Sequence, residues 1–470
     1  MGTLHLQIAE NLRLVGAGAD PAAWAAVLAW AEGRLAFDNP AYWQARAHRR
    51  RCAHLPRRID LLRRDGDDLL LPRGVNVELK RLLAREVPGV DVAIRDARVA
   101  PPAVGLRLAV ALRPYQQEAV ACAVARKEGV LVAPTGSGKT VIAMGLIAAL
   151  GLRTLILVHT RTLLDQTCAV VERCLGVRAG RMGGGDDAPG EVTVATVQTI
   201  VRRDPAALRD QFGLVLLDEA HHAPAATFTD VLQRLAARHR FGLTATPERA
   251  DQLHPLMYAT LGPELWRAQP SEMVRIGSLC AARVVPIETT FRGGRMMDRG
   301  RMIERLCESR QRNLEILRTI LATRGERALV LSERVQHCET LVELLDAKGV
   351  RARLLVGALD VTTRAAAVAI VVKEGGVLVA TGSLVGEGFD CPELDTLYLV
   401  VPSGNATRTT QALGRVLRPK PGKAPPFVFD FLDIETPALV RSWRRRVQVY
   451  RGHDAEVMAA RHVREFGVTD

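Results

Sequence analysis

Residues 133–140 have the composition of a loop that binds phosphate groups. Gly136 and Gly138 allow backbone N–H groups to turn toward a triphosphate, and Lys139 and Thr140 follow directly. Lys139 would reach the β- and γ-phosphates, while the Thr140 hydroxyl would hold Mg²⁺. Kinases and transporter ATPases carry similar loops, so the segment alone does not say what ATP would drive. It predicts ATP and Mg²⁺ as ligands, bound by Pro134, Thr135, Gly136, Ser137, Gly138, Lys139 and Thr140.

Two acidic residues, Asp218 and Glu219, follow an apolar run at 212–217 that is typical of a buried strand. The carboxyl end of a parallel strand is where an open α/β sheet places its chemistry. Asp218 is placed to hold Mg²⁺, and Glu219 to orient and deprotonate the attacking water. The alternative is an acidic helix start followed by two solvated histidines. The upstream phosphate-binding loop favours the catalytic interpretation.

The elements that must position these residues are short apolar runs that alternate with helical periods. The first series of expected strands is 130–132, 154–158, 192–195, 214–217 and 241–244. The second series is 328–332, 352–355, 377–380, 397–400 and 427–431. Strands that alternate with helices form parallel sheets covered on both faces. The sequence therefore predicts an α/β protein with two tandem, doubly wound parallel-sheet lobes.

Proline, glycine and arginine content divides the chain further. Residues 247–312 are punctuated by prolines and glycines, which indicates a linker and peripheral elements around a hinge. The predicted parts are an N-terminal α+β accessory domain at 1–108, a first lobe at 109–285, a second lobe at 286–435 and a basic helical arm at 436–470. The accessory domain is expected to engage duplex or branched DNA, because it is rich in arginine and carries no convincing catalytic set. We expect a chain without residues 1–105 to keep its basal ATP turnover but to bind duplex or forked DNA less tightly, with a shallower salt dependence.

Length and cysteine usage exclude several classes of protein. At 470 residues the chain is too long for a single ordinary core. Its eight cysteines form no Cys-x-x-Cys pair, which argues against a zinc ribbon, an iron–sulfur cluster and a disulfide framework. No apolar run reaches about 18 residues, and the N-terminus lacks the plan of a signal peptide. We expect a cytoplasmic protein with reduced thiols and no membrane partner.

The net charge of +13 comes mainly from arginine, because only seven of the 64 basic residues are lysines. The planar guanidinium suits bidentate contact with phosphate, so a polyanionic partner is the natural inference. The alternative is that alanine and arginine richness records a GC-rich genome. The arginine clusters at 49–51 and 444–446 favour nucleic acid.

Further sequence blocks, in a fixed order over residues 110–432, resemble the motifs of superfamily 2 nucleic-acid helicases. The resemblance implies two RecA-like lobes with ATP and Mg²⁺ between them and nucleic acid crossing both. It also implies that Gln116 reads the edge of the adenine base, with Arg113 or Tyr115 packed near it. Pro114 is equally typical of the first turn of an amphipathic helix, which does not exclude that role.

The same resemblance assigns roles to residues that follow other expected strands. Contact with the sugar-phosphate backbone of one strand is implied for Thr160, Arg161, Thr196, Gln198, Thr199 and Thr381. Short hydroxyl and amide side chains suit phosphates, although a capped helix start would explain each loop alone. Thr244 and Thr246 would couple hydrolysis to the second lobe. Gly388 would allow close backbone approach to the nucleotide, and Asp390 would meet the ribose.

Gln411, Arg415 and Arg418 resemble the motif that closes the ATP site from the second lobe. Their spacing of four and then three residues places an amide and two guanidiniums on one face of a helix. Such a face can present arginine fingers to the γ-phosphate, a large contribution to phosphoryl-transfer rates. A solvated basic helix is the alternative.

The N-terminal region looks like the accessory region of XPB- and UvsW-type helicases and of related restriction-type helicase subunits. Asp67, Glu78 and Lys80 also have the order of a metal-dependent nuclease site. That site needs the Glu-x-Lys segment on a strand, whereas 77–87 shows helical periodicity. We therefore predict a helix there and no nuclease.

The combined pattern predicts an ATP-dependent DNA helicase or translocase that acts in repair, recombination or defence. The resemblance implies 3′–5′ movement on single-stranded, forked or branched DNA. A separate nuclease or repair protein is a further expected partner. An RNA helicase is one alternative, and an ATP-gated nucleic-acid clamp that recruits a nuclease without unwinding is another.

Overall fold

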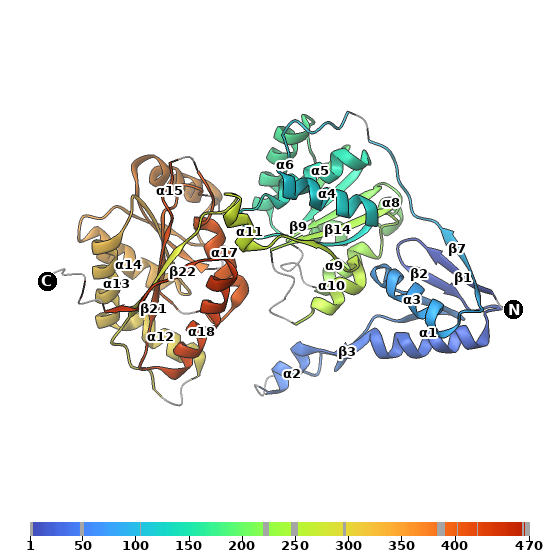
Figure 1. Cartoon of the computed structure of the whole chain (residues 1–470), viewed down its shortest axis with the longest axis horizontal. Coiled ribbons are helices and arrows are strands. Elements are labelled where there is room, and N and C mark those ends of the chain that lie inside the picture. Colours follow the sequence, from blue (N-terminus) through green and yellow to red (C-terminus); the bar gives the residue numbers. More distant parts are fainter. Residues whose placement is uncertain are drawn as a thin grey trace. The chain divides into compact units, whose positions relative to one another are not determined.

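The computed structural model describes residues 3–47, 51–103, 105–219, 225–245, 252–294, 298–382, 391–401, 403–420, 422–462 and 465. The chain divides into two compact units (Figure 1). The first contains Met1–Ala133 and Gly138–Arg267; the second contains Ala268–Asp470 together with Pro134–Ser137. Each unit has its own large sheet, so the predicted α/β fold with two parallel-sheet lobes and an N-terminal α+β region is confirmed.

The sheet of the first lobe has eight strands in the order β11-β10-β12-β9-β13-β14-β8-β15, and only β11 runs antiparallel to its neighbour. All five strands predicted for this lobe are present. The strands are β8 (Glu128–Val132), β9 (Thr154–Val158), β10 (Gly180–Gly183), β11 (Asp186–Ala188), β12 (Val192–Thr196), β13 (Leu214–Asp218), β14 (His239–Thr244) and β15 (Glu264–Arg267). Every residue of β8, β9 and β13 is buried, which explains their continuous apolar runs.

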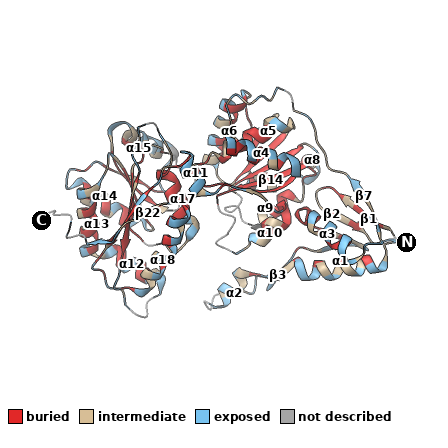
Figure 2. Cartoon of the chain, in the orientation of Figure 1, coloured by how far each residue is buried: buried red, intermediate tan, exposed pale blue. Residues whose placement is uncertain are grey.

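Helices cover both faces of this sheet. Figure 1 draws α4, α5 and α6 on one side of β9 and β14, and α9 and α10 on the other. The helices of the lobe are α4 (Pro114–Arg126), α5 (Lys139–Leu150), α6 (Arg161–Leu175), α7 (Val197–Val201), α8 (Pro205–Leu208), α9 (Ala225–Leu232) and α10 (His254–Leu261). Figure 2 shows the strands between them as buried.

The N-terminal region of the first unit has a five-stranded sheet in the order β5-β6-β2-β1-β7. Its strands are β1 (Thr3–Ile8), β2 (Leu12–Val15), β5 (Arg63–Asp65), β6 (Asp68–Leu71) and β7 (Asp91–Asp96). Two strands form a separate ribbon, β3 (Ala36–Asp38) and β4 (Arg58–Asp60). The helices are α1 (Pro21–Arg34), α2 (Pro40–Ala47), the 3₁₀ turn η1 (Arg73–Val75) and α3 (Asn76–Glu86).

Glu78 and Lys80 lie on α3, so the predicted helix is confirmed and the strand that a nuclease site requires is not present there. Glu78 instead pairs with Arg34 of α1, with its carboxylate oxygens 2.9 and 3.1 Å from the guanidinium. The nuclease interpretation is therefore rejected on geometry.

The N-terminal region is joined to the first lobe by a buried arginine. The Nε of Arg73 lies 2.6 Å from Oε2 of Glu128, the first residue of β8. Its Nη1 donates to the carbonyl oxygens of Ala9 and Ala237, at 3.0 and 2.6 Å. The Arg73 side chain is 0% exposed and that of Glu128 is 7% exposed, so solvent screens the pair little.

Neighbouring contacts tighten the same interface. Arg240 of β14, also buried, donates to the carbonyl oxygen of Glu10 at 3.0 Å. A Cβ on Gly74 would lie 2.5 Å from the carbonyl oxygen of Tyr258, so only glycine allows η1 to approach α10 this closely. Removal of residues 1–105 would expose apolar side chains of the first lobe that share one core with the N-terminal region, and the basal turnover of such a chain stays a prediction.

The second unit has an eight-stranded parallel sheet, in which seven strands follow the order β18-β19-β17-β20-β21-β16-β22 and the eighth, β23, also pairs with β16. The strands are β16 (Arg283–Glu288), β17 (Arg327–Ser332), β18 (Ala352–Leu355), β19 (Gly376–Thr381), β20 (Thr396–Leu399), β21 (Phe427–Leu432), β22 (Glu456–Val457) and β23 (Arg461–His462). Its described helices are α11 (Pro270–Arg275), α12 (Arg299–Glu308), α13 (Arg310–Thr323), α14 (Val335–Asp346), α15 (Val361–Glu374), α17 (Ala406–Val416) and α18 (Pro437–Gly452). All five strands predicted for this lobe are present.

Three details differ from the sequence-based expectations. The predicted lobe boundary at 285/286 falls inside β16, although the assignment of domain roles itself stays a prediction. The C-terminal arm is not helical throughout, because β22 and β23 follow α18. Arg446 is not available to a polyanion: it is 2% exposed and makes a bidentate pair with Asp430, at 2.8 and 2.7 Å. Within the described residues, no helix is both long and apolar enough to cross a bilayer.

Substitution Glu128→Gln tests the buried connection. We expect it to lower the free energy of unfolding by about 3 to 5 kcal/mol, because Arg73 would stay buried without a carboxylate partner. The matched control is Glu78→Gln, which breaks a pair whose side chains are 40% and 44% exposed and should cost less than about 1 kcal/mol. The measurement is denaturant unfolding of the full chain, and equal losses in the two variants would contradict the buried role.

Candidate nucleotide and nucleic-acid site

The predicted phosphate-binding loop joins the end of β8 to the start of α5. Gly136 and Gly138 have φ angles of 90° and 79°, a region that favours glycine. The hydroxyl of Ser137 donates to the carbonyl oxygen of Pro134 at 2.7 Å, which closes the turn. Lys139 is the first residue of the twelve-residue helix α5, so unpaired backbone N–H groups and the positive end of the helix dipole lie at the loop.

Lys139 lies beside the predicted catalytic carboxylates. Its Nζ is 3.2 Å from Oε1 of Glu219, and its side chain is 8% exposed. Asp218 is the last residue of β13, and its Oδ1 accepts the backbone N–H of Glu219 at 2.9 Å. Glu219 has a φ angle of 49°, a strained conformation for a residue with a side chain. Such strain is found at functional sites, because the surrounding structure must hold it in place.

Burial raises the pKa of Asp218, the Glu219 carboxylate adds to the rise and Lys139 opposes it, and together they bring the pKa to about 6. The ionised site thus has more negative charge than Lys139 compensates. A divalent cation would supply the missing charge, and the Asp218 carboxylate with the Thr140 hydroxyl forms an oxygen donor set of the kind that Mg²⁺ prefers. These residues therefore fit the predicted metal.

The predicted base-reading segment starts α4. Gln116 is 5% exposed, and its Oε1 accepts the backbone N–H of Arg113 at 3.0 Å. A Cβ on Gly138 would lie 2.8 Å from Nε2 of Gln116, so the amide reaches the end of the phosphate-binding loop. The Tyr115 ring lies parallel to that of Trp266, with centroids 6.4 Å apart, and is part of the lobe's own packing. The adenine contacts stay a prediction.

Five predicted nucleic-acid contacts gather at the carboxyl ends of β9 and β12, which are neighbours in the sheet. The Nε2 of Gln198 donates to the carbonyl oxygen of His159 at 3.4 Å, which links the two loops. Each loop also begins a capped helix, because the hydroxyls of two threonines accept backbone N–H groups one turn later. The residues brought together are Thr160, Arg161, Thr196, Gln198 and Thr199.

A turn that sequence reasoning missed lies against both loops. Gly183, Gly184 and Gly185 all have positive φ angles, and a Cβ on Gly184 would lie 2.9 Å from Nε of Arg161. A Cβ on Gly183 would lie 3.1 Å from Oγ1 of Thr199. The run of three glycines in the sequence was the available signal for close backbone approach at this place.

The residues predicted to couple the lobes are described only in part. Thr244 ends β14, is 0% exposed, and its carbonyl oxygen accepts the backbone N–H of Ala133 at 2.9 Å. Thr381 ends β19 and is 7% exposed. Thr246, Gly388 and Asp390 lie outside the described residues.

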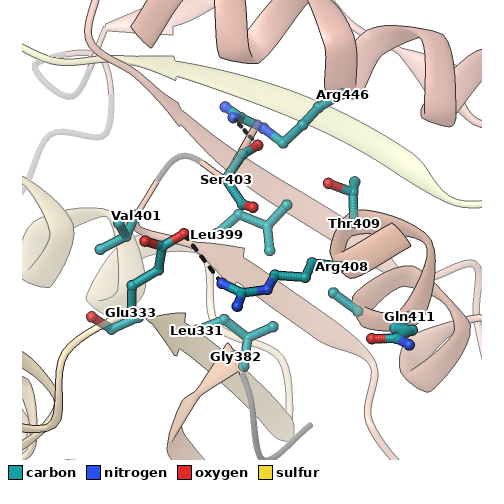
Figure 3. A pocket seen from close by; sticks show the side chains of 12 residues that line it. Leu331, Glu333, Gly382, Leu399, Val401, Ser403, Arg408, Thr409, Gln411 and Arg446 are labelled. Carbon is teal, nitrogen blue, oxygen red and sulfur yellow. Dashed lines mark hydrogen bonds and ion pairs between the residues drawn. The ribbon is translucent and has the colours of Figure 1, made fainter. Parts of the chain in front are cut away.

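A small pocket of about 40 Å³ opens at the carboxyl ends of β17, β19 and β20 in the second unit (Figure 3). Arg408 of α17 points across it to Glu333, with Nη1 to Oε1 at 3.8 Å. Arg299 of α12 approaches the same carboxylate at 3.6 Å. The lining residues are Leu331, Ser332, Glu333, Gly382, Leu399, Val401, Ser403, Arg408, Thr409, Gln411, Ala412 and Arg446. The Arg408–Glu333 pair was not predicted from the sequence.

The predicted arginine fingers do not all lie on one helix. Gln411 and Arg415 are on α17 and are 6% and 7% exposed, but α17 ends at Val416, before Arg418. Pro419 explains the early end, because the residue before a proline disfavours helical geometry. The single helical face therefore holds for Gln411 and Arg415 only.

Lys423, which sequence reasoning also missed, holds the segment that carries Arg418. Its Nζ donates to the carbonyl oxygens of Pro392, Val416 and Arg418, at 2.9, 2.8 and 3.0 Å. Burial lowers the pKa of Lys423. The ammonium thus fixes the C-terminal end of α17.

Comparisons with known proteins match both lobes. Residues 109–249 match a family model described as type III restriction enzyme, res subunit, and residues 312–420 match the helicase conserved C-terminal domain. The DNA 3′–5′ translocase XPB2 of Sulfurisphaera tokodaii is 37% identical over 164 residues, which cover 35% of this chain and 37% of that protein. The DNA 3′–5′ helicase XPB of Kineococcus radiotolerans is 29% identical over 328 residues, which cover 66% of this chain and 58% of that protein.

These matches leave much of the two relatives uncovered, since the chain spans 37% and 58% of their lengths. Among solved structures, the ATP-dependent type ISP restriction-modification enzyme LlaBIII bound to DNA matches with a TM-score of 0.55 and 16% identity. The match covers 73% of this chain and 30% of that one. At this identity the likeness shows the fold alone.

The raised pKa of Asp218 makes stability depend on pH in the nucleotide-free protein. Since the folded-state pKa of about 6 lies above the ordinary 3.8, the stabilising effect of the protonated form is complete below pH 3.8 and is lost as pH rises through 6. Substitution Asp218→Asn keeps an acceptor for the Glu219 N–H and removes the charge. We expect the variant to be more stable than the wild type by about 2 to 3 kcal/mol at about pH 7.5, and by much less at about pH 4.5. Thermal unfolding across this range is the measurement, and a pH-independent difference would contradict it.

Proposed function

The chain belongs to the superfamily 2 helicases, and we propose that it uses ATP hydrolysis to move along DNA and to unwind or remodel it. The observation that carries the proposal is the contact of Lys139 with Glu219 beside buried Asp218, at the end of a phosphate-binding loop. A cation, a base and a metal-binding carboxylate within one site are the groups that phosphoryl transfer from ATP requires.

Each of these residues has a distinct task in the proposed reaction. Lys139 neutralises charge on the β- and γ-phosphates, which frees Glu219 from the ion pair of 3.2 Å. Glu219 then orients the attacking water and accepts its proton. Mg²⁺, when held by Asp218 and Thr140, supplies further neutralisation of phosphate charge. Arg415 and Arg418 would stabilise the transferred phosphoryl group from the second lobe.

The proposed nucleic-acid contact begins at the linked loops of β9 and β12. Their hydroxyls, the Gln198 amide and the Arg161 guanidinium are groups that bind phosphate oxygens without reading base sequence. In the second lobe, Thr381 and the neighbouring Arg408 pocket offer the same kind of group. A motor that moves along a strand needs contacts of this sort, since base-specific contacts would stop it at particular sites.

DNA as the substrate and 3′–5′ movement are supported by the names of the two XPB relatives. Roles in repair, recombination or defence are proposed on the same ground. A separate nuclease as partner is supported by the restriction-enzyme description of the first family model alone.

Two substitutions test the ATP chemistry. We expect Lys139→Ala to lose both nucleotide binding and turnover, because the phosphates would lack their cation. We expect Glu219→Gln to bind ATP but to lose turnover by at least about 100-fold, because the water would lack its base. Steady-state ATPase assays and binding of a fluorescent ATP analogue are the measurements. Turnover by Glu219→Gln at the wild-type rate would remove Glu219 as the base.

The same assay separates DNA from RNA as the substrate. Wild-type turnover is expected to rise on addition of single-stranded DNA and much less on addition of RNA of the same sequence. A strand-displacement assay with an unlabelled trap strand then distinguishes unwinding from a clamp that only binds. Stimulation by RNA alone would replace the proposal with an RNA helicase.

Lys423 is expected to be a positioning residue for Arg418. Substitution Lys423→Met should lower kcat for ATP about tenfold with little change in KM, because it frees a finger that acts in the closed state rather than in ATP binding. Lys420→Met is the matched control, since Lys420 lies in the same loop and pairs with Glu393, at 2.9 Å. An equal kcat for the two variants would contradict the role of Lys423.

A further inference from the structure

The ribbon β3–β4 and the helix α2 form a small outlying element of the N-terminal region. Figure 1 draws α2 beyond β3, away from the five-stranded sheet. None of the eight residues of α2 is buried, and Figure 2 shows its surface as exposed or half-buried. A helix that buries none of its residues contributes little to the core.

Asn39 holds this element in one shape. It is 6% exposed, and its Nδ2 donates to the carbonyl oxygen of Pro56 at 2.9 Å. Its Oδ1 accepts the backbone N–H of Ala41 at 3.1 Å, and its own N–H donates to the carbonyl oxygen of Arg57 at 3.0 Å. The start of α2 and the segment that leads through Arg57 into β4 are thereby fixed to each other.

The result is a surface cluster of two aromatic rings and two guanidiniums, which we call the Trp43 cluster: Tyr42, Trp43, Arg46 and Arg57. The two rings meet edge to face with centroids 5.3 Å apart. The guanidinium carbons of Arg46 and Arg57 lie 5.5 and 5.6 Å from the centroid of the Trp43 ring. Trp43 is 38% exposed.

The cluster carries uncompensated positive charge. Residues 36–60 contain six arginines and only two aspartates. Within the described part of the chain, no ion pair is recorded for Arg46, Arg51 or Arg57, and all three are exposed. Other exposed arginines of the N-terminal region are of both kinds: Arg34 and Arg85 have carboxylate partners, whereas Arg63 and Arg81 show no ion pair within the described residues. Arg46 and Arg57 differ in that both lie over one aromatic ring, which gathers two exposed positive charges where an anion from another molecule can reach them.

We propose that the Trp43 cluster binds unpaired nucleotides of the DNA substrate, with a base stacked on the Trp43–arginine surface and its phosphates on Arg46 and Arg57. This rests on the proposed function, which supplies DNA as the substrate. Aromatic rings interleaved with arginines bind single strands through stacking and charge together. In an intact duplex the bases already stack on each other, so only phosphates would be available to the cluster and no base could stack on it.

The geometry thereby makes the N-terminal region a second single-strand contact, separate from the loops of β9 and β12. It would engage the frayed arm of a fork or an overhang. An acidic protein segment could satisfy the arginines, but it would provide no flat base for the indole. Unpaired DNA therefore offers bases to the aromatic rings of the cluster and phosphates to its guanidiniums.

Substitution Trp43→Ala in the full chain tests the stacking contact. We expect affinity for a forked DNA with a single-stranded arm to fall about 5- to 100-fold, the effect of losing one base–aromatic stack. Affinity for a relaxed circular duplex should change less than about twofold. Trp43→Phe, which keeps a ring, should recover most of the affinity. Ile94→Ala is the matched control, because Ile94 is 48% exposed on β7 in the same region.

Substitution Arg57→Ala tests the charge. It should lower the dependence of log affinity on log salt concentration for single-stranded DNA by about 0.7, the contribution of one phosphate contact. Arg85→Ala, which removes an arginine paired with Glu86, should leave the slope unchanged. Fluorescence anisotropy at several salt concentrations gives both the affinities and the slopes.

Three outcomes would overturn the inference: fork affinity of Trp43→Ala equal to the wild type, equal losses on fork and circular duplex, or losses matched by Ile94→Ala. DNA-stimulated ATP turnover, measured on the same samples, separates this inference from the proposed function. Absence of such stimulation in the wild-type protein would contradict the proposed function. Normal stimulation of the wild type, together with unchanged fork affinity in Trp43→Ala, would contradict only the role of the cluster.

Discussion

The buried pair between Arg73 and Glu128 is the contact on which the arrangement of the first unit depends. An unpaired charge in that place would be costly, so the two partners hold the N-terminal sheet and the start of β8 together. Arg240 and Gly74 surround the pair with further contacts that only a close fit permits. The N-terminal region consequently packs as part of the first unit and is not a separate domain on a flexible linker.

Parallel topology explains why the candidate site assembles where it does. Strands β8, β9, β12, β13 and β14 all end at the same edge of the sheet, so residues far apart in sequence meet there. Lys139 and Glu219 are 80 positions apart, yet their charged atoms are 3.2 Å apart. The same edge carries Asp218 with its raised pKa and the linked loops that carry Thr160 and Thr196. The shared direction of the strands thus places the candidate nucleotide site and the candidate nucleic-acid loops at one edge of the sheet.

Much of this could be predicted from the residues, because the signals are local. The phosphate-binding loop, the ten strands and the helix at Glu78 follow from glycine spacing and hydrophobic periodicity. Contacts between distant residues gave no such signal. Nothing near Arg73 or Arg446 in the sequence indicates that each would be buried against a carboxylate, and the two-residue strands β22 and β23 are too short to show a period. Arg418 is an intermediate case, because its spacing from Gln411 and Arg415 predicts a shared helical face, whereas Pro419 indicates that the helix ends before it.

Strand β8 has a mechanical consequence. Its first residue, Glu128, is tied to the N-terminal region, and its last residue, Val132, runs into the phosphate-binding loop. The strand is fully buried, is hydrogen-bonded on both edges, and spans about 13 Å from end to end. An extended strand of this kind cannot lengthen further. A force on the N-terminal region would therefore be transmitted along β8 to the phosphate-binding loop. A displacement of that loop would change how it binds the nucleotide.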